Sequence, residues 1–405
     1  MFSPKSMHGL RSIFTPLLSQ IDGLCKIILI AGTNGKGETA HSLDYLLRQN
    51  GQSVGLWTSP HIVSVCERFR FCGEMVGPQQ LLTTIREVWI DLADDAKRLS
   101  YYEFLFYVFC RLALVHRPQY LILEVGLGGR WDAVNLFTPC LSLITSIGRD
   151  HMEYLGPTLQ HVLMEKFGIC RPFVPLISFM TNDYLGQRAR VLAKYFHIPY
   201  KALSDIQIAS QVKSIYWKRN QLQAYMAFKF LCSQAGIDGD DKQLMIEFEK
   251  INFPTFNARR EELICSKTRF IFIGAHNMEG MREAVYSLAT NHKNSHKIVQ
   301  KGRKILVSFS RRTENEMVVM LKSIINAPCV AKEVILTSFV HPKAAGPKQL
   351  GLVWHKLGNK SVRFQDNFKD CILHEINLGT PEILVLGSYY FIGEVKKYLS
   401  NIEFT

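Results

Sequence analysis

The sequence lacks the cysteine patterns that define disulfide-rich and metal-binding proteins. Its ten cysteines, Cys329 among them, are scattered along 405 residues without a C-x-x-C pair or the spacing of metal ligands. We interpret them as reduced, mostly buried thiols, which are typical of a cytoplasmic protein. Repeats and low-complexity tracts are also absent. With 47% hydrophobic and 20% charged residues, the composition is that of an ordinary globular protein.

Long apolar runs are missing as well. The densest apolar stretch, residues 101–115, contains Glu103 and Arg111 and is too short to span a bilayer. We therefore expect a buried helix there. Near the N-terminus, Pro4 and Arg11 are among the residues that interrupt any apolar region, so a signal peptide is not expected. The sequence gives no reason to expect a membrane partner.

Acidic residues are few relative to basic ones. The chain has 48 Lys and Arg against 35 Asp and Glu, a formal net charge of +13. Such a balance favours anionic partners through long-range steering. Nucleic acid, nucleotide phosphates and an acidic substrate all fit this charge. The excess also fits basic side chains on solvated faces, so charge alone leaves the partner open.

The length and the apolar pattern predict two α/β domains. A chain of 405 residues exceeds the size at which one hydrophobic core usually stops growing. In the N-terminal part, short apolar runs typical of strands alternate with helical spacing of apolar residues, which indicates a parallel sheet covered on both faces. The predicted strands are 26–31, 54–57, 119–125 and 141–147, and the predicted helices are 39–49 and part of 79–98.

A short polar stretch that contains a proline, residues 252–262, marks the predicted boundary. The α/β alternation restarts beyond it, with predicted strands at 269–273, 304–309, 333–338 and 382–386 and a helix over 278–289. The resulting fold class is a P-loop-type α/β domain with a parallel sheet, followed by a smaller Rossmann-like α/β domain. The boundaries are 1–256 for the first domain, 257–264 for a linker and 265–405 for the second domain.

A glycine turn at residues 32–37 separates the first predicted strand from the first helix. Such a turn directs backbone N–H groups at an anion, and Lys36 adds a positive charge suited to phosphates. The match to the ordinary P-loop pattern G-x-x-x-x-G-K-[ST] is imperfect, because Ile30 stands at the first glycine and Gly37 follows the lysine. The pattern favours phosphate binding over a purely structural turn.

Two further polar residues stand at ends of predicted strands. Glu124 ends the run 121–124 in the position of a Walker-B-type acid, from which it could reach a Mg²⁺ held by the phosphates. His151 follows the strand 141–147. Taken alone, a carboxylate at a strand end is usually solvated and a loop histidine is usually structural. The pairing of Glu124 with Lys36 makes a nucleotide site the better interpretation.

Taken in order, these segments resemble the folylpolyglutamate synthase and dihydrofolate synthase family, a branch of the Mur ligase superfamily. The resemblance runs from about Gly9 to Val395. An ordered series of motifs is more specific than any one of them. The motifs lie at residues 31–37, 58–61 (Thr-Ser-Pro-His), 67–70 (Glu-Arg-Phe-Arg), 124–130 with Asp132 and Asn135, 150–151, 165–166 with Gly168, 274–277 (Gly-Ala-His-Asn), 341–345 and 387–388.

The resemblance implies ATP and Mg²⁺ as cofactors and assigns residues to both. It implies catalytic roles for Lys36, Lys166 and His151, with Lys166 matching a lysine that is carbamylated in this superfamily. From the residues alone, Lys166 would be interpreted as a surface lysine on a helix. The implied Mg²⁺ ligands are Ser59, Glu124 and His151. The implied ATP-binding residues are Gly32, Thr33, Asn34, Gly35, Lys36, Gly37, Glu38, Thr39, Gln223, Arg259 and His276.

The activity implied by the resemblance is amide ligation in two steps. ATP phosphorylates a carboxylate of dihydropteroate or a reduced folate, and the amino group of L-glutamate attacks the acyl phosphate. Neither nucleic acid nor a membrane is an expected partner, and a monomer in the cytoplasm is implied. Two alternatives remain: a Mur-type amino-acid ligase with another acceptor, and a degenerate, non-catalytic member that binds anions or nucleic acid.

The chain departs from the family pattern at three places. Glu38 stands where the family usually has serine, beside the retained Thr39, and it would repel phosphates unless it points away from them or binds the metal. A glutamate in a first helical turn is also favoured by the helix dipole. Ile273 replaces the acid of a D-G-A-H-N motif, and residues 311–313 are Arg-Arg-Thr in place of an acidic segment. These changes bear on nucleotide affinity rather than on the fold.

Overall fold

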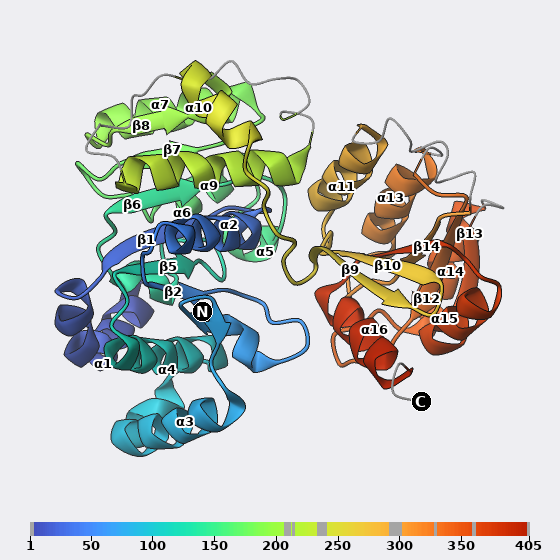
Figure 1. Ribbon diagram of the computed structural model, residues 1–405, viewed down its shortest axis with the longest axis horizontal. Helices are drawn as coiled ribbons and strands as arrows, with labels where there is room; N and C mark the ends of the chain where they lie inside the picture. Colours follow the sequence, from blue (N-terminus) through green and yellow to red (C-terminus); the bar gives the residue numbers. More distant parts are fainter. Residues whose placement is uncertain are drawn as a thin grey trace. The chain divides into compact units, whose positions relative to one another are not determined.

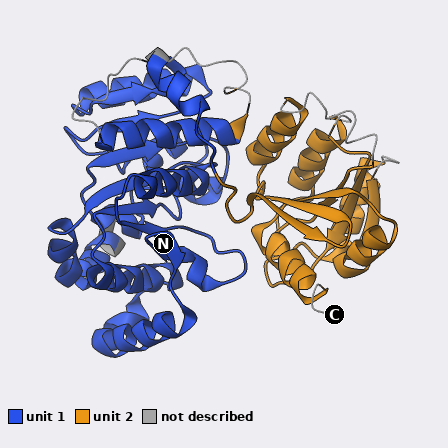
Figure 2. Cartoon of the chain, in the orientation of Figure 1, with its two compact units in different colours: residues 1–208, 217–253 blue, residues 209–216, 254–405 orange. Residues whose placement is uncertain are grey.

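The computed structural model divides the chain into two compact units (Figures 1 and 2). Unit 1 comprises residues 1–208 and 217–253, and unit 2 comprises residues 209–216 and 254–405. The structure describes residues 4–205, 212, 215–232, 241–290, 302–327, 330–358 and 362–402. The predicted boundary at 256/257 therefore lies just beyond the division at 253/254, and no sequence signal indicated that residues 209–216 belong with unit 2.

Unit 1 is built on an eight-stranded sheet in the order β4-β3-β2-β5-β1-β6-β7-β8. The six strands from β2 to β8 in this order are parallel to one another. At one edge, β3 pairs antiparallel with β2, and β4 pairs antiparallel with β3. The strands are β1 (Lys26–Ala31), β2 (Val54–Trp57), β3 (Phe69–Phe71), β4 (Glu74–Met75), β5 (Tyr120–Glu124), β6 (Leu141–Ile144), β7 (Leu176–Ser178) and β8 (Tyr200–Ala202). The four strands predicted in this part of the chain correspond to β1, β2, β5 and β6.

The α-helices of unit 1 include two whose first residues are fixed by local chemistry. α2 begins at Lys36, directly after the glycine turn, and α4 begins with a capping box between Ser100 and Glu103. The helices are α1 (Pro4–Asp22), α2 (Lys36–Gln49), α3 (Pro78–Leu92), α4 (Tyr101–His116), α5 (Met152–Leu155), α6 (Leu159–Phe167), α7 (Asp183–Tyr195), α9 (Tyr216–Cys232) and α10 (Asp241–Glu249), and the 3₁₀ turns are η1 (Val65–Arg68), η2 (Ala93–Arg98), η3 (Ala133–Leu136) and η4 (Leu203–Asp205).

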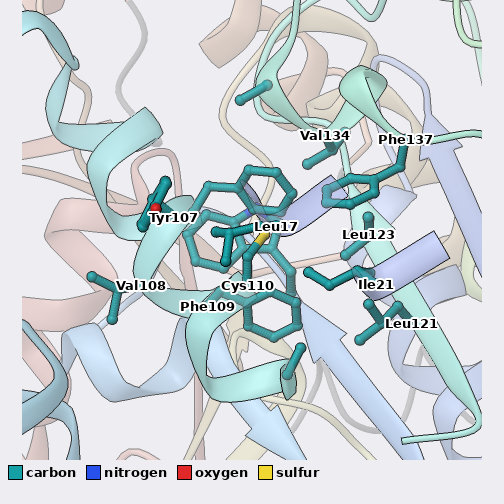
Figure 3. Close-up of a cluster of buried hydrophobic side chains, with 14 of the residues drawn as sticks. Leu17, Ile21, Tyr107, Val108, Phe109, Cys110, Leu121, Leu123, Val134 and Phe137 are labelled. Carbon is teal, nitrogen blue, oxygen red and sulfur yellow. The ribbon is translucent and has the colours of Figure 1, made fainter. Parts of the chain in front are cut away.

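The main core of unit 1 lies between the sheet and the pair α1 and α4. Phe109 of α4, together with Leu17 and Ile21 of α1, packs with Leu121 and Leu123 of β5 (Figure 3). The apolar run 101–115 is thus the buried helix that was predicted. None of the helices that the structure describes is long and apolar enough to cross a membrane.

Unit 2 contains a six-stranded sheet in the order β13-β12-β11-β14-β10-β9, parallel throughout except for the β9–β10 pair. The strands are β9 (Arg259–Cys265), β10 (Thr268–Ile273), β11 (Lys304–Val307), β12 (Glu333–Ser338), β13 (Val362–Asn367) and β14 (Glu382–Leu386). Most of the segment predicted as a linker is strand β9. Its first four residues are charged and its last three are apolar, and antiparallel pairing with β10 places the strand at the edge of the sheet, where charge is tolerated.

Helices surround the sheet of unit 2, with a core between the strands and α11, α13 and α14. The helices are α11 (Met278–Thr290), α13 (Glu314–Ile325), α14 (Pro347–Leu357), α15 (Phe368–Asn377) and α16 (Tyr389–Ile402). The predicted strands 269–273, 304–309, 333–338 and 382–386 correspond to β10, β11, β12 and β14. Cys329 lies outside the described residues, and the other nine cysteines are free thiols.

Candidate nucleotide site

The predicted site residues of unit 1 gather at the carboxyl ends of its central strands. β2, β5, β1 and β6 are adjacent and parallel, so the segments that follow them meet at one edge of the sheet. Ser59 follows β2, Glu124 ends β5, the glycine turn follows β1, and His151 lies beyond β6. This edge is the usual position of ligand sites in parallel α/β sheets.

The glycine turn has a conformation that requires glycine. Gly32 has φ of 155° and Gly35 has φ of 90°, in the region that side chains disfavour. A Cβ at Gly32 would overlap the hydroxyl of Thr145, and a Cβ at Gly35 would overlap the side-chain amide of Asn220. Gly35 offers α2 no side-chain cap. The first N–H groups of α2 therefore have no side-chain cap and are suited to bind an anion.

Hydroxyl groups beyond β6 hold the turn in place. The backbone N–H of Asn34 donates to the Ser146 hydroxyl at 2.9 Å, and the Asn34 carbonyl accepts from Thr145 Oγ1 at 2.6 Å. Thr33 Oγ1 accepts from the backbone N–H of Gly148 at 2.9 Å. Sequence reasoning missed the hydroxyls of Thr145 and Ser146. The signal available was a Thr-Ser pair directly after an apolar strand, the same position that drew attention to Glu124.

Two lysine amines converge on the carbonyl oxygen of Gly32. Lys36 Nζ donates to it at 3.0 Å, and Lys166 Nζ, from the last turn of α6, donates to it at 2.9 Å. Lys166 is only 4% exposed, so its interpretation as a surface lysine is wrong. Burial, and then the positive charge of Lys36, lower the pKa of the Lys166 amine to about 7.

Glu38 and Thr39 are both buried in the first turn of α2. Gln221 Nε2 of α9 lies 3.5 Å from Glu38 Oε1, and Thr39 Oγ1 donates to the carbonyl of Asn220 at 3.4 Å. Both side chains therefore contact α9. The contact with Gln221 gives the Glu38 carboxylate a polar partner, which is one of the ways in which it could coexist with a bound phosphate.

Glu124 is the best-placed carboxylate for a metal ion. It is 3% exposed at the end of β5, and its Oε2 accepts from the backbone N–H of Ser59 at 2.9 Å. This bond brings two of the predicted Mg²⁺ ligands together. Within the part of the chain that the structure describes, no three His, Cys, Asp or Glu side chains form a ready metal cluster. Further donors would have to come from hydroxyls, phosphates or water, which are ligands that Mg²⁺ accepts.

His151 occupies the residue before α5, in a left-handed conformation with φ of 51°. Its ring nitrogens lie 3.9 Å from Asp150 Oδ1 and 3.8 Å from Glu153 Oε1, and its side chain is 49% exposed. The imidazole thus has acidic neighbours and access to solvent. A metal role for His151 stays a prediction.

The loop after Glu124 is fixed by Asp132 and Tyr102. Asp132 accepts from the backbone N–H groups of Gly126 at 2.9 Å and Leu127 at 3.0 Å, and from the Tyr102 hydroxyl at 3.1 Å. The same hydroxyl accepts from Trp57 Nε1 at 3.2 Å. Burial raises the pKa of Asp132 to about 6, against the opposing effect of these hydrogen bonds.

Gln223, predicted as a nucleotide contact, is fully buried on α9. Its Nε2 donates to the carbonyls of Ile144 and Ile177, both at 3.0 Å, and thereby joins the ends of β6 and β7. The amide oxygen has no hydrogen-bond partner. In this structure Gln223 supports the sheet, and its role toward ATP stays a prediction. Asn220, which sequence reasoning missed, is the α9 residue that packs on the glycine turn.

The remaining predicted site residues belong to unit 2. Arg259 begins β9, and its Nη1 donates to the carbonyl of Asn257 at 2.9 Å. His276 follows β10, with Nδ1 3.2 Å from the carbonyl of Gly274 and its ring 4.9 Å from that of Tyr389. Asn277 accepts from the backbone N–H of Gly280 at 2.8 Å and so caps α11.

The departures in unit 2 have structural roles. Ile273 is the last residue of β10 and is buried. Thr313 caps α13 through a capping box with Glu316, and the Arg312 carbonyl accepts from Gln349 Nε2 at 2.9 Å. The segment 311–313 is therefore built into the fold as a helix start.

Unit 1 is a P-loop-type nucleotide-binding unit. It has a glycine turn between a central parallel strand and a helix, two lysine amines beside that turn, and a carboxylate at the end of the neighbouring strand. None of the protein-family models compared with the chain matches it. The dihydrofolate synthase/folylpolyglutamate synthase of Bacillus subtilis is 27% identical over 402 residues, which cover 91% of this chain and 89% of that protein.

Solved structures agree with this similarity. Folylpolyglutamate synthase of Mycobacterium tuberculosis complexed with ADP has a TM-score of 0.79 at 22% identity, covering 98% of this chain and 95% of that one. The bifunctional folylpolyglutamate synthase/dihydrofolate synthase of Yersinia pestis complexed with AMPPNP and Mn has a TM-score of 0.75 at 20% identity, covering 97% and 93%. Over almost its whole length the chain is thus similar to folylpolyglutamate synthases and dihydrofolate synthases.

Proposed function

We propose that the protein is an ATP- and Mg²⁺-dependent ligase that adds L-glutamate to dihydropteroate, to reduced folates or to both. The observation that carries the proposal is the convergence of Lys36 and Lys166 on Gly32 O, one strand away from the buried Glu124. Cations at the head of a phosphate loop and a carboxylate at the neighbouring strand end are the parts that a Mg-ATP site requires. The sequence similarity to the Bacillus enzyme supports the choice of substrates.

The residues of unit 1 fit both cofactors. The glycine turn has the backbone conformation of an anion cradle, and Lys36 is half-buried beside it. Glu124 and the hydroxyl of Ser59 offer hard oxygen donors, with His151 as the third proposed ligand. Mg²⁺ supplies charge that offsets the negative charge of the transferring phosphoryl group. ADP and AMPPNP with Mn in the similar structures support this assignment.

The proposed reaction has two chemical steps. A carboxylate oxygen of the acceptor attacks the γ-phosphorus of ATP, which forms an acyl phosphate and releases ADP. The amine of L-glutamate then attacks the acyl carbon, which forms the amide and releases phosphate and a proton. Lys36 stabilises the phosphoryl oxygens, and the glycine turn orients them. No covalent enzyme nucleophile is required.

Four further assignments belong to the proposal. Arg259 and His276 of unit 2 contact the nucleotide, and unit 1 and unit 2 correspond to the ATP-binding and glutamate-ligase domains. Lys166, whose amine is partly neutral near pH 7, is the site of carbamylation. The protein acts as a monomer in the cytoplasm. The free thiols of the nine described cysteines suit a reducing compartment.

One assay tests the function. The protein is incubated with Mg-ATP, L-glutamate and either dihydropteroate or tetrahydrofolate, and phosphate release and the glutamylated product are measured together. We expect phosphate release that depends on both the acceptor and L-glutamate, and which acceptor supports it defines the activity. Absence of acceptor-dependent product, together with salt-sensitive binding of nucleic acid, would favour a non-catalytic member of the family.

A further inference from the structure

Arg68 is a buried guanidinium with few partners. It ends η1, is 8% exposed, and donates from Nε to His61 Nδ1 at 3.0 Å. Its guanidinium carbon lies 5.9 Å from the centre of the Trp57 ring. Nη1 is buried and has no hydrogen-bond partner. Among the described residues, no carboxylate forms an ion pair with Arg68.

The nearest acid in sequence does not neutralise this charge. The two oxygens of Glu67 accept from the backbone N–H groups of Ile62, Val63 and Ser64 at 2.7 to 2.9 Å. A buried cation that lacks an anion carries a large desolvation cost. An unsatisfied guanidinium N–H adds to it. The fold therefore maintains at Arg68 a positive charge for which the described residues supply no ion-pair partner.

Arg68 lies at the edge of the sheet that carries the candidate site. The next residue, Phe69, pairs with Trp57 at the carboxyl end of β2, and Trp57 is in register with Leu123, directly before Glu124. In the sheet order, β5 separates β2 from β1. Glu124 thus stands between two positively charged positions, Lys36 beyond β1 and Arg68 beside β2.

We propose that Arg68 binds the carboxylate of the acceptor substrate, an inference that rests on the proposed ligase function. The glycine turn and the lysines on the β1 side already provide for the nucleotide phosphates. An acceptor carboxylate that attacks the γ-phosphorus must approach from the side opposite the leaving ADP, which is the β2 side. A guanidinium matches a carboxylate in planar, two-point geometry.

Binding requires a small rearrangement. Because Nη1 is buried, an incoming carboxylate reaches it only when neighbouring residues shift, among them His61, the acceptor of the Arg68 Nε hydrogen bond. Residues 58–61 form neither helix nor strand and precede the backbone that Glu67 holds, so they can move without breaking secondary structure or the Glu67 hydrogen bonds. Acceptor binding is then coupled to the position of Ser59, whose backbone N–H contacts Glu124.

The test compares Arg68→Met and Arg68→Lys with the wild-type protein and with Arg111→Met. Arg111 pairs with Asp91 on the surface and is the matched control. We expect Arg68→Met to raise the KM for dihydropteroate or tetrahydrofolate by about tenfold or more, as loss of a charge-assisted contact predicts, with the KM for ATP unchanged. Arg68→Lys keeps the positive charge but lacks the planar pair of guanidinium donors, so it should raise the KM for the acceptor less.

The other outcomes overturn the inference, the ligase function or both. An unchanged acceptor KM in a folded Arg68 variant removes the proposed contact, and a raised KM for ATP alone assigns Arg68 to phosphate. If Arg68→Met does not fold, Arg68→Lys decides on the same criteria. Direct binding of dihydropteroate and tetrahydrofolate by equilibrium dialysis separates the two proposals. Binding that Arg68→Met weakens, without turnover by the wild-type protein, overturns the ligase function alone, and no binding by the wild-type protein overturns both.

Discussion

The side-chain amines of Lys36 and Lys166 donate to the same carbonyl oxygen, that of Gly32, at 3.0 and 2.9 Å. One neutral oxygen does not compensate two ammonium groups, so their repulsion is relieved either by loss of a proton or by arrival of an anion. The fold thus places two positively charged groups beside the glycine turn. Lys166 is the group that yields a proton, because it is the more buried of the two.

Replacement of Lys36 by alanine should abolish turnover and leave the protein folded. Lys36 is half-buried, and among the described residues its amine donates to the carbonyls of Gly32 and Thr33, so little packing is lost. Removal of a cation at developing phosphoryl charge costs about 100-fold or more in kcat. Thermal unfolding and phosphate release check the two parts. The control is Lys97→Ala, on the exposed turn η2, and wild-type rates in Lys36→Ala would mean that the turn is structural.

The low pKa of Lys166 predicts how its contribution to stability varies with pH. The amine loses its proton near pH 7 in the folded protein, against 10.5 for an unperturbed lysine. Between these values the unfolded chain binds more protons, so the free energy of unfolding rises with pH, by at most about 1.4 kcal/mol per pH unit. Urea unfolding in CO₂-free buffer between pH 7.5 and 9 should show a steeper rise for the wild-type protein than for Lys166→Met. An equal rise of the free energy of unfolding with pH in both proteins would contradict the lowered pKa of Lys166.

The same neutral amine should react with CO₂. An uncharged amine adds to CO₂ and releases a proton, which leaves a carbamate where a cation had been. We expect ¹³C-labelled bicarbonate at pH 8 to give a carbamate signal in the NMR spectrum of the wild-type protein. Lys166→Met should lack this signal, and Lys97→Ala should retain it. A signal of equal strength in Lys166→Met would assign the carbamate to another amine.

Glu38→Ser should leave ATP binding intact. The Glu38 carboxylate lies 3.5 Å from the Gln221 amide, a contact at the limit of hydrogen bonding. Removal of a negative charge near the phosphates should leave the Kd for Mg-ATP equal or lower. Calorimetric titration of wild-type protein, Glu38→Ser and Glu38→Gln measures this. A large loss of affinity in both variants would show that Glu38 has become a ligand.

Tyr102→Phe should destabilise unit 1. The Tyr102 hydroxyl is buried among Trp57 Nε1, the backbone N–H of Gly126 and the Asp132 carboxylate. Its removal leaves these groups partly unsatisfied, at a cost of about 1–3 kcal/mol. Denaturant unfolding of the variant should show this loss, whereas Tyr101→Phe, on the exposed side of the same helix, should unfold like the wild-type protein. Equal stability of the two variants would mean that water replaces the hydroxyl.

The central strands of unit 1 were predictable because each is a short apolar run with a polar residue at its end. β1 and β2 agree with their predicted bounds, and β5 and β6 end slightly earlier than predicted. The helix α1 gave no comparable signal. Its buried residues do recur at helical spacing (Leu10, Ile13, Phe14, Leu17, Leu18 and Ile21), but no strand or glycine turn marks the start of the helix, and its burial depends on α4, which is far away in sequence.

The burial of Lys166 could not be predicted from its neighbours. A lysine after Glu165 is ordinarily exposed, and here burial results from packing of α6 on the loop that follows β5. A Cβ at Gly129 would lie 2.8 Å from the carbonyl of Glu165, which is how closely loop and helix approach. Long-range contacts of this kind leave only an indirect mark in a single sequence, in this case a glycine. For the same reason the family resemblance implied Gln223 as the contact from α9, whereas packing brings Asn220 to the glycine turn.

The close approach of Asn220 to Gly35 limits which residues can replace this glycine during evolution. Position 35 is restricted to glycine by the amide of α9 as well as by its φ of 90°, independently of any nucleotide. A relative that has lost ATP binding would still keep this glycine as long as it keeps Asn220. Positions 35 and 220 should therefore covary among homologues, and persistence of the glycine alone is poor evidence that a homologue has retained catalysis.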